Sequence, residues 1–172
     1  MEDRPPEYEG GSPPQNKGKQ VKMKEKLPLL LLVEDNEDDV LLTLRALRGL
    51  NVANRVEVAR DGAEAIDFLT GEGKFADRDT SDAPQFIMLD LNLPKLSRLE
   101  VLRKVRELPI GRTMPVIMLT TSKQEGDMKQ AYELGANSYV TKPVESDSFK
   151  SAIDSLGMYW LAVNTPPPKP RI

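Results

Sequence analysis

Residues 86–94 read FIMLDLNLP, and the single acid among them is Asp90. The four residues before it are apolar, and prolines at positions 84 and 94 bound the run. An apolar run too short for a helix is typical of a strand that is buried on both faces inside a parallel sheet. Its acid would lie at the carboxyl end of the strand, where open α/β sheets bind their ligands. Asp90 is therefore the first candidate for a functional residue.

The prolines divide the chain into a central segment and two tails. Of the 14 prolines among 172 residues, four lie in residues 1–26 and four in residues 165–172. Residues 1–26 carry too little apolar surface to offset the entropy of ordering, so we predict a disordered N-terminal tail. Residues 165–172 are predicted to form a proline-rich C-terminal tail. Residues 27–164 are long enough for one domain with a single hydrophobic core.

The composition excludes several function classes. The chain has neither cysteine nor histidine, which rules out disulfide frameworks, thiolate or imidazole metal sites, and catalysis by either side chain. A net charge of −3 and an isoelectric point near 5.2 argue against a nucleic-acid surface, which would need a basic face. No apolar run approaches the length of a membrane span, and the first residues do not begin a signal peptide. We therefore expect a soluble cytoplasmic protein without a membrane segment.

Strand and helix patterns alternate five times along the central segment. Strands are predicted at residues 29–33, 55–59, 85–90, 116–120 and 138–140, and helices at residues 38–50, 61–69, 99–107, 124–134 and 146–163. Gly135 follows the fourth helix, as a helix-ending glycine does. Because parallel strands need crossovers, the alternation predicts a doubly wound α/β fold, a flavodoxin-like five-stranded parallel sheet with strand order 2-1-3-4-5. The polar segment 71–83 is either disordered or a functional insertion.

Polar residues also follow other strands at the edge where Asp90 is expected. Glu34 and Asp35 follow the first strand, Thr120 ends the fourth, and Lys142 follows the fifth. Taken singly, the acids could favour the N-terminus of the next helix, and the lysine and threonine could be ordinary surface and strand-end residues. Because the carboxyl ends of parallel strands converge, their joint placement indicates one site.

The residue types at this edge favour phosphoryl chemistry. Three carboxylates in contact repel one another unless a cation compensates them, and an oxygen-only ligand set selects a hard ion such as Mg²⁺. Lys142 adds a positive charge and Thr120 a hydroxyl donor for an anionic group on Asp90. A carboxylate nucleophile, a metal and two donors together predict a site that holds a phosphoryl group.

Four blocks of sequence resemble the receiver domain of two-component response regulators. The blocks are LVEDN at 32–36, LDLNLP at 89–94, PVIMLT at 115–120 and YVTKP at 139–143, in the order of the family. The resemblance covers residues 28–163 and implies a receiver-type fold. The segment 71–83, the LNLP variant and the aromatic final helix resemble more narrowly the small stand-alone regulators that partner bacterial phytochrome kinases.

The resemblance implies a role for each candidate residue. Asp90 is implied as the phosphoacceptor for a sensor histidine kinase, and Lys142 as the cation that pairs with the phosphate. Mg²⁺ is the implied cofactor, held by Glu34, Asp35, Asp90 and the backbone carbonyl of Asn92, with Thr120 as the switch hydroxyl and Tyr139 as the aromatic switch. Such a protein is a signalling receiver that catalyses only its own phosphorylation and dephosphorylation.

Two backbone details follow from the same resemblance. The bond between Lys142 and Pro143 matches the position of a cis peptide in the family, and X–Pro bonds adopt the cis form at low cost. Where the family commonly has Asp-Gly, this chain has Ser97-Arg98. Ser97 can still cap a helix, but Arg98 would be strained by about 1 kcal/mol or more if the position needed a positive φ.

Two other function classes compete with the phosphorelay receiver. Phosphatases of the haloacid-dehalogenase type also form an aspartyl phosphate, but they carry the nucleophile after the first strand with a second Asp two residues on. Here Asp90 follows the third strand and position 92 is Asn. A flavodoxin-like flavin carrier would need a phosphate loop after the first strand, where this chain has the acidic run EDNEDD at 34–39. The hydrolase is the stronger alternative.

The last predicted helix carries apolar residues at steps of four and three, a spacing typical of a helix that packs along a partner. Its candidate interface residues are Phe149, Ile153, Tyr159 and Trp160, of which the first two would also cover the sheet. Since little sheet remains beside Tyr159 and Trp160, we expect them to be exposed anchors of a homodimer. Only the proline tail follows, so we expect output by partner binding or onward phosphotransfer.

Overall fold

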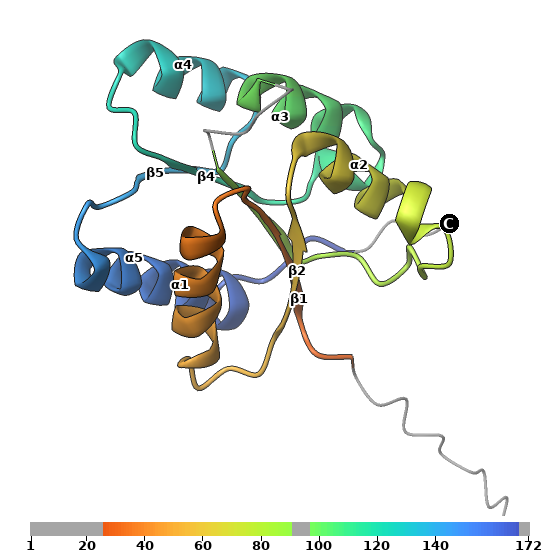
Figure 1. The fold of residues 1–172 in the computed structure, drawn as a ribbon. Helices are drawn as coiled ribbons and strands as arrows, with labels where there is room; N and C mark the ends of the chain where they lie inside the picture. Colours follow the sequence, from red (N-terminus) through yellow and green to blue (C-terminus); the bar gives the residue numbers. More distant parts are fainter. Residues whose placement is uncertain (1–25, 91–96, 169–172) are drawn as a thin grey trace, which may run out of the picture.

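The computed structural model describes residues 26–90 and 97–168, which contain five strands and five α-helices in alternation (Figure 1). The strands are β1 (Leu29–Val33), β2 (Arg55–Ala59), β3 (Phe86–Asp90), β4 (Val116–Thr120) and β5 (Ser138–Thr141). The helices are α1 (Glu37–Arg48), α2 (Gly62–Thr70), α3 (Arg98–Glu107), α4 (Glu125–Glu133) and α5 (Ser146–Met158). The predicted α/β class is confirmed. None of the helices in these ranges is long and apolar enough to cross a membrane.

All five strands are parallel and lie in the predicted order β2-β1-β3-β4-β5. The register places Val33 beside Leu89, Asp90 beside Leu119 and Thr120 beside Thr141. The carboxyl ends of the four strands β1, β3, β4 and β5 therefore meet at one edge of the sheet. This arrangement is what brings the polar residues after each strand together.

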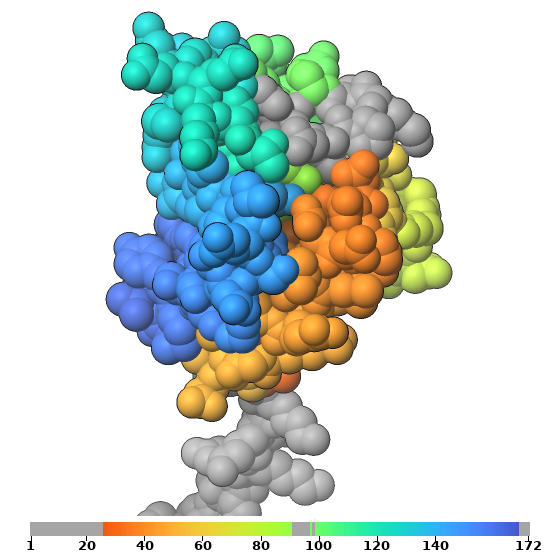
Figure 2. All heavy atoms as spheres, turned by 60° about the vertical axis from the view of Figure 1, so that its left-hand side comes forward, coloured from red at the N-terminus to blue at the C-terminus, as the bar shows by residue number. Residues whose placement is uncertain are grey.

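Helices cover both faces of the sheet, with α1 and α5 on one face and α2, α3 and α4 on the other (Figure 1). Alternate residues of each strand serve opposite faces: Leu31 packs with the core beneath α2 to α4, whereas Leu30 and Leu32 pack with the core beneath α1 and α5. This double burial explains why β1, β3 and β4 read as continuous apolar runs. On the surface, α1 (orange) and α5 (blue) lie side by side (Figure 2).

Side-chain caps fix the starts of the helices near the site. The Asn36 side chain accepts a hydrogen bond of 3.1 Å from the backbone N–H of Asp39 and so caps α1, which begins three residues beyond Glu34. Ser97 and Glu100 form a reciprocal capping box at the start of α3. Gly135 has a φ of 91° and follows Leu134, the C-cap of α4, as predicted for a glycine that ends a helix.

The structure decides two backbone details: the condition for strain at Arg98 is not met, and the expected cis bond before Pro143 is wrong. Arg98 begins α3 in helical conformation, so the position after Ser97 needs no positive φ and imposes no strain. The described residues contain no cis peptide bond, so the bond between Lys142 and Pro143 is trans. The trans form is also the lower-energy isomer of an ordinary X–Pro bond, by about 0.5–1 kcal/mol.

The segment after α2, residues 71–83, is folded against that helix. The ring of Phe75, at the end of a short 3-10 helix, meets the ring of Phe68 edge to face at 5.1 Å. The Arg78 guanidinium lies over the Phe68 ring, 3.8 Å from its centroid, and donates hydrogen bonds to the carbonyls of Phe68 and Asp82. Of the two readings that the sequence left open, disorder is therefore wrong.

The predicted final helix consists of α5 and a π-helical turn, Tyr159–Val163. Phe149 and Ile153 cover the sheet as expected. Trp160 is only 9% exposed, and its ring lies 6.2 Å from that of Phe86, the first residue of β3. The expectation that Trp160 is an exposed anchor is wrong, because the start of β3 offers its ring an apolar surface beyond the end of α5. Tyr159 is 49% exposed, in agreement with the sequence interpretation.

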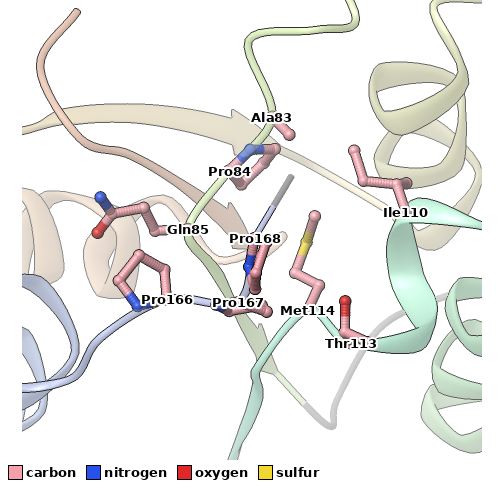
Figure 3. Close-up of a pocket in the computed structure, with 9 residues that line it drawn as sticks. All are labelled: Ala83, Pro84, Gln85, Ile110, Thr113, Met114, Pro166, Pro167 and Pro168. Carbon is pink, nitrogen blue, oxygen red and sulfur yellow. The ribbon is translucent and has the colours of Figure 1, made fainter. Parts of the chain in front are cut away.

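The chain after this turn passes the residues that precede β3 and β4, at the amino-terminal ends of these strands. Prolines 166 to 168 lie opposite Met114 and beside the residues that precede β3 (Figure 3). Together they line a small open pocket formed by Ala83, Pro84, Gln85, Ile110, Thr113, Met114, Pro166, Pro167 and Pro168. The first part of the predicted C-terminal tail is thus in contact with the domain.

Candidate functional site

Lys142 lies at the centre of the polar cluster at the carboxyl edge. Its ammonium donates hydrogen bonds to Glu34 Oε2 at 2.6 Å, to Asp39 Oδ2 at 2.8 Å and to Asp90 Oδ2 at 3.1 Å. The side chains of Lys142, Glu34 and Asp90 are almost fully buried, whereas that of Asp39 is 34% exposed. Since an ammonium has three protons, these three carboxylates occupy its full donor capacity.

Glu34, Asp35 and Asp90 form a group that fits a hard metal ion. One carboxylate oxygen from each lies within 4.8 Å of the others. Glu34 and Asp90 are buried and Asp35 is exposed, so the group opens to solvent on one side. Oxygen ligands, a high negative charge and room for water on one side suit Mg²⁺, which usually keeps several waters. The donor set therefore agrees with the predicted metal site.

Burial and mutual repulsion shift two pKa values in this cluster. Burial, together with the adjacent Asp90 carboxyl, raises the pKa of Glu34 to about 7, although the Lys142 ammonium acts in the opposite direction. Burial alone would lower the pKa of Lys142, but its hydrogen bonds to Asp39 and Glu34 and the charge of Asp90 outweigh burial and raise that pKa above its ordinary value. The lysine is therefore a permanent cation, while Glu34 changes charge near neutral pH.

Thr120 and Tyr139 both contact Ser122, two residues beyond the end of β4. The Thr120 hydroxyl is buried and accepts a hydrogen bond of 2.8 Å from the backbone N–H of Ser122. The Tyr139 hydroxyl donates to the carbonyl of Ser122 at 3.4 Å, and its ring is half-buried. Because Thr120 only accepts in this contact, its own proton stays available to a further acceptor. The segment around Ser122 connects the two predicted switch residues.

Comparison with known proteins assigns the chain to a family. Residues 30–154 match the response regulator receiver domain. The chain belongs to the response-regulator receiver family. This receiver is 34% identical over 139 residues to the response regulator Rcp1 of Synechocystis sp., a match that covers 81% of this chain and 92% of that protein. It is 35% identical over 139 residues to the probable methanogenesis regulatory protein FilR2 of Methanothrix harundinacea, covering 81% and 87% respectively.

Solved structures similar to this receiver include several phytochrome response regulators. The phosphorylated cyanobacterial phytochrome response regulator RcpA is 35% identical, with a TM-score of 0.77 over 83% of this chain and 100% of that one. The bacteriophytochrome response regulator AtBRR is 47% identical, with a TM-score of 0.63 over 81% and 99%. The Mn²⁺-bound form of Rcp1 is 33% identical, with a TM-score of 0.76 over 82% and 99%. These relatives confirm both the receiver resemblance and the narrower one.

The sequence interpretation located most of this receiver's polar cluster and missed one member. The structure brings Glu34, Asp35, Asp90 and Lys142 together and places Thr120 at the end of the neighbouring strand. Asn92 lies outside the described residues. Asp39 was missed as a partner of Lys142, because it belongs to an acidic run that precedes and enters a helix and such runs commonly serve the helix N-terminus. Its place in the first turn of the helix that follows β1 was the available signal.

Proposed function

We propose that this receiver accepts a phosphoryl group from a sensor histidine kinase onto Asp90, in a reaction that depends on Mg²⁺. The observation that supports the proposal best is the position of Asp90. It ends the central strand β3 and lies within hydrogen-bond distance of the Lys142 ammonium. One of its carboxylate oxygens is also close enough to oxygens of Glu34 and Asp35 for the three residues to bind one metal ion. A carboxylate in this position has a cation beside it that can neutralise the charge of the incoming phosphoryl group. It also belongs to a group of carboxylates that can bind a metal ion.

In the proposed reaction, a carboxylate oxygen of Asp90 attacks the phosphorus of the phosphohistidine. A P–O bond forms, the P–N bond breaks, and the histidine nitrogen leaves with the bonding electron pair. Lys142 donates from its ammonium to a phosphoryl oxygen. Glu34, Asp35 and Asp90, with the backbone carbonyl of Asn92, would hold Mg²⁺, which neutralises charge on the phosphoryl oxygens when bound.

The proposed switch uses the residues that meet at Ser122. The free proton of the Thr120 hydroxyl turns to a phosphoryl oxygen, and the segment around Ser122 follows it. The Tyr139 hydroxyl then loses its carbonyl partner, and its half-buried ring moves inward. Phosphorylation thereby biases an equilibrium between two arrangements of one fold.

The relatives support a phytochrome kinase as the partner class. RcpA and AtBRR are described as phytochrome and bacteriophytochrome response regulators, and this chain spans nearly their whole length. We propose a cytoplasmic protein without nucleic-acid binding, whose output is binding of a protein partner or onward phosphotransfer. We also propose a homodimer through the last helix, with Tyr159 as its exposed aromatic residue.

Phosphotransfer tests this function directly. Purified histidine kinases of the same organism, labelled with ³²P, are incubated with wild type and with Asp90→Asn, with Mg²⁺ or with excess chelator. We expect label on wild type only with Mg²⁺, in an acid-stable and hydroxylamine-labile linkage, because the acyl phosphate forms only when charge on both reactants is neutralised. Label that persists in Asp90→Asn, or forms equally well in chelator, contradicts the assignment. A labelled receiver that catalyses rapid turnover of small phosphate esters would favour the hydrolase.

A further inference from the structure

The contact between Asp39 and Lys142 has no part in the reaction proposed above. Asp39 Oδ2 lies 2.8 Å from the lysine ammonium, closer than the 3.1 Å to Asp90 itself. Asp39 is also absent from the carboxylate group that fits a metal, which among the described residues comprises Glu34, Asp35 and Asp90. It is thus a charged partner of the phosphate-pairing lysine that neither the metal nor the phosphoryl group requires.

The other two partners of Lys142 change their bonding during the proposed reaction. Asp90 Oδ2 belongs to the carboxylate that becomes an acyl phosphate, and Glu34 is a proposed metal ligand. Once the metal and the phosphoryl group are bound, both carboxylates interact with these groups, and they become weaker hydrogen-bond acceptors for the lysine. Asp39 is the one member of the trio whose interaction with the ammonium can persist from the resting state through the transfer.

Asp39 is itself held firmly. It is the third residue of α1, and its backbone N–H is capped by Asn36. Its carboxylate lies at the positive end of the helix dipole, which favours a charged form. The next residue, Val40, is buried in the core beneath α1 and α5, so the start of the helix cannot shift without disturbing that core. A fixed carboxylate of this kind can restrict a long, flexible lysine side chain to one position.

We propose that Asp39 is a positioning residue that fixes the Lys142 ammonium for phosphoryl transfer to Asp90. One lysine proton is committed to Asp39, so the remaining two point to Glu34 and Asp90, where the phosphoryl oxygens arrive. This inference deepens the proposed function and rests on it. It assigns no metal ligation and no contact with the phosphoryl group to Asp39.

A double-mutant cycle with acetyl phosphate tests the inference. In that reaction an Asp90 oxygen bonds to phosphorus, the bond from phosphorus to the bridging oxygen breaks, and acetate leaves. Four proteins are compared at saturating Mg²⁺: wild type, Asp39→Ala, Lys142→Ala and the double variant. We expect Asp39→Ala to lower the maximal phosphorylation rate about tenfold, with little change in the acetyl phosphate concentration at half-maximal rate, and to have no further effect when Lys142 is already Ala.

Matched variants separate positioning from general charge or folding effects. Asp38→Asn removes the same charge one residue away, at an exposed position that is not among the lysine's partners, and should keep the wild-type rate. Asp39→Asn keeps an acceptor oxygen and should recover part of the rate lost in Asp39→Ala. The midpoint of urea unfolding and the Mg²⁺ affinity of the Asp39 variants should stay close to wild type, since Asp39 is partly exposed and is no ligand.

The possible failures are distinguishable. If wild type acquires no label on Asp90 from any donor, the proposed function itself is wrong. If wild type is phosphorylated normally but the Asp39→Ala effect is equal with and without Lys142, Asp39 does not act through the lysine and only this inference is overturned. A faster rate in Asp39→Ala would also overturn it, because Asp39 would then withhold the lysine from the phosphoryl group.

Discussion

We expect Glu34 to set the pH range in which the cluster binds a metal ion. Its pKa is raised to about 7 by burial and by Asp90, so at pH 6 a metal ion must displace a proton. We expect the apparent dissociation constant for Mg²⁺ to fall about tenfold between pH 6 and pH 8, with release of close to one proton at the lower pH. Isothermal titration calorimetry in two buffers of different ionisation enthalpy measures both quantities. An affinity that is flat over this range contradicts the assignment, and Glu34→Gln should show such flat behaviour.

The same carboxyl makes the metal-free protein less stable as pH rises. Its pKa is about 7 in the folded state and 4.5 as a free side chain, so between these values the unfolded chain has released a proton that the folded chain keeps. The free energy of unfolding should fall across this window by up to about 3 kcal/mol. Urea unfolding in chelator at pH 5 and pH 8 measures the change. In Glu34→Gln the free energy of unfolding should not fall over this pH range. If wild type is more stable at pH 8 than at pH 5, the prediction is wrong.

The end of α5 is held by Trp160, which is buried against Phe86, and not by its exposed neighbour Tyr159. We expect Trp160→Ala to lower the free energy of unfolding by about 3 kcal/mol or more, because it removes a large buried ring. Tyr159→Ala should cost less than about 1 kcal/mol. Circular dichroism during urea unfolding compares the two variants. Similar small losses in both would show that the last turn is not part of the core.

At the scale of elements, most of the fold could be predicted, because the hydrophobic pattern of each segment agrees with the place of that segment in the sheet or on its faces. The predicted bounds of β1, β2 and β4 match the structure, since each is a short apolar or alternating run with clear boundaries. The site followed from the same logic, because strand order determines which strand ends meet. The rest depends on long-range packing that periodicity does not encode: the burial of Trp160 on Phe86, the folding of segment 71–83 onto Phe68, and the reach of Lys142 to Asp39.

At the scale of the whole molecule, phosphorylation should be separable from its signal. Thr120→Ala removes the hydroxyl that accepts from Ser122. We expect this variant still to be phosphorylated on Asp90, since it keeps the nucleophile and the lysine, but to leave Tyr139 in its resting position. Amide and aromatic NMR shifts around Ser122 and Tyr139, with and without phosphorylation, measure this. A Tyr139 response equal to that of wild type would show that the hydroxyl is not the relay.

The oligomeric state is a second property of the whole molecule, and burial of Trp160 changes how it must be probed. Because Trp160→Ala disturbs the core, Tyr159→Ala is the informative variant. We expect wild type to sediment as a dimer at tens of micromolar. In Tyr159→Ala the dissociation constant of the dimer should rise about tenfold or more. Sedimentation with and without phosphorylation shows whether dimerisation depends on phosphorylation. A wild-type monomer throughout would remove the dimer from the proposal.

The placement of Trp160 also gives this receiver a built-in optical probe. It is the one tryptophan in the sequence, and its ring packs at the first residue of β3, whereas Asp90 is the last residue of the same strand. A strand of five residues spans about 13–17 Å, so the indole is remote from the acidic edge. Its emission spectrum therefore reports the integrity of the sheet and the α5 turn, whereas phosphorylation at the opposite end is followed through the NMR shifts of Tyr139.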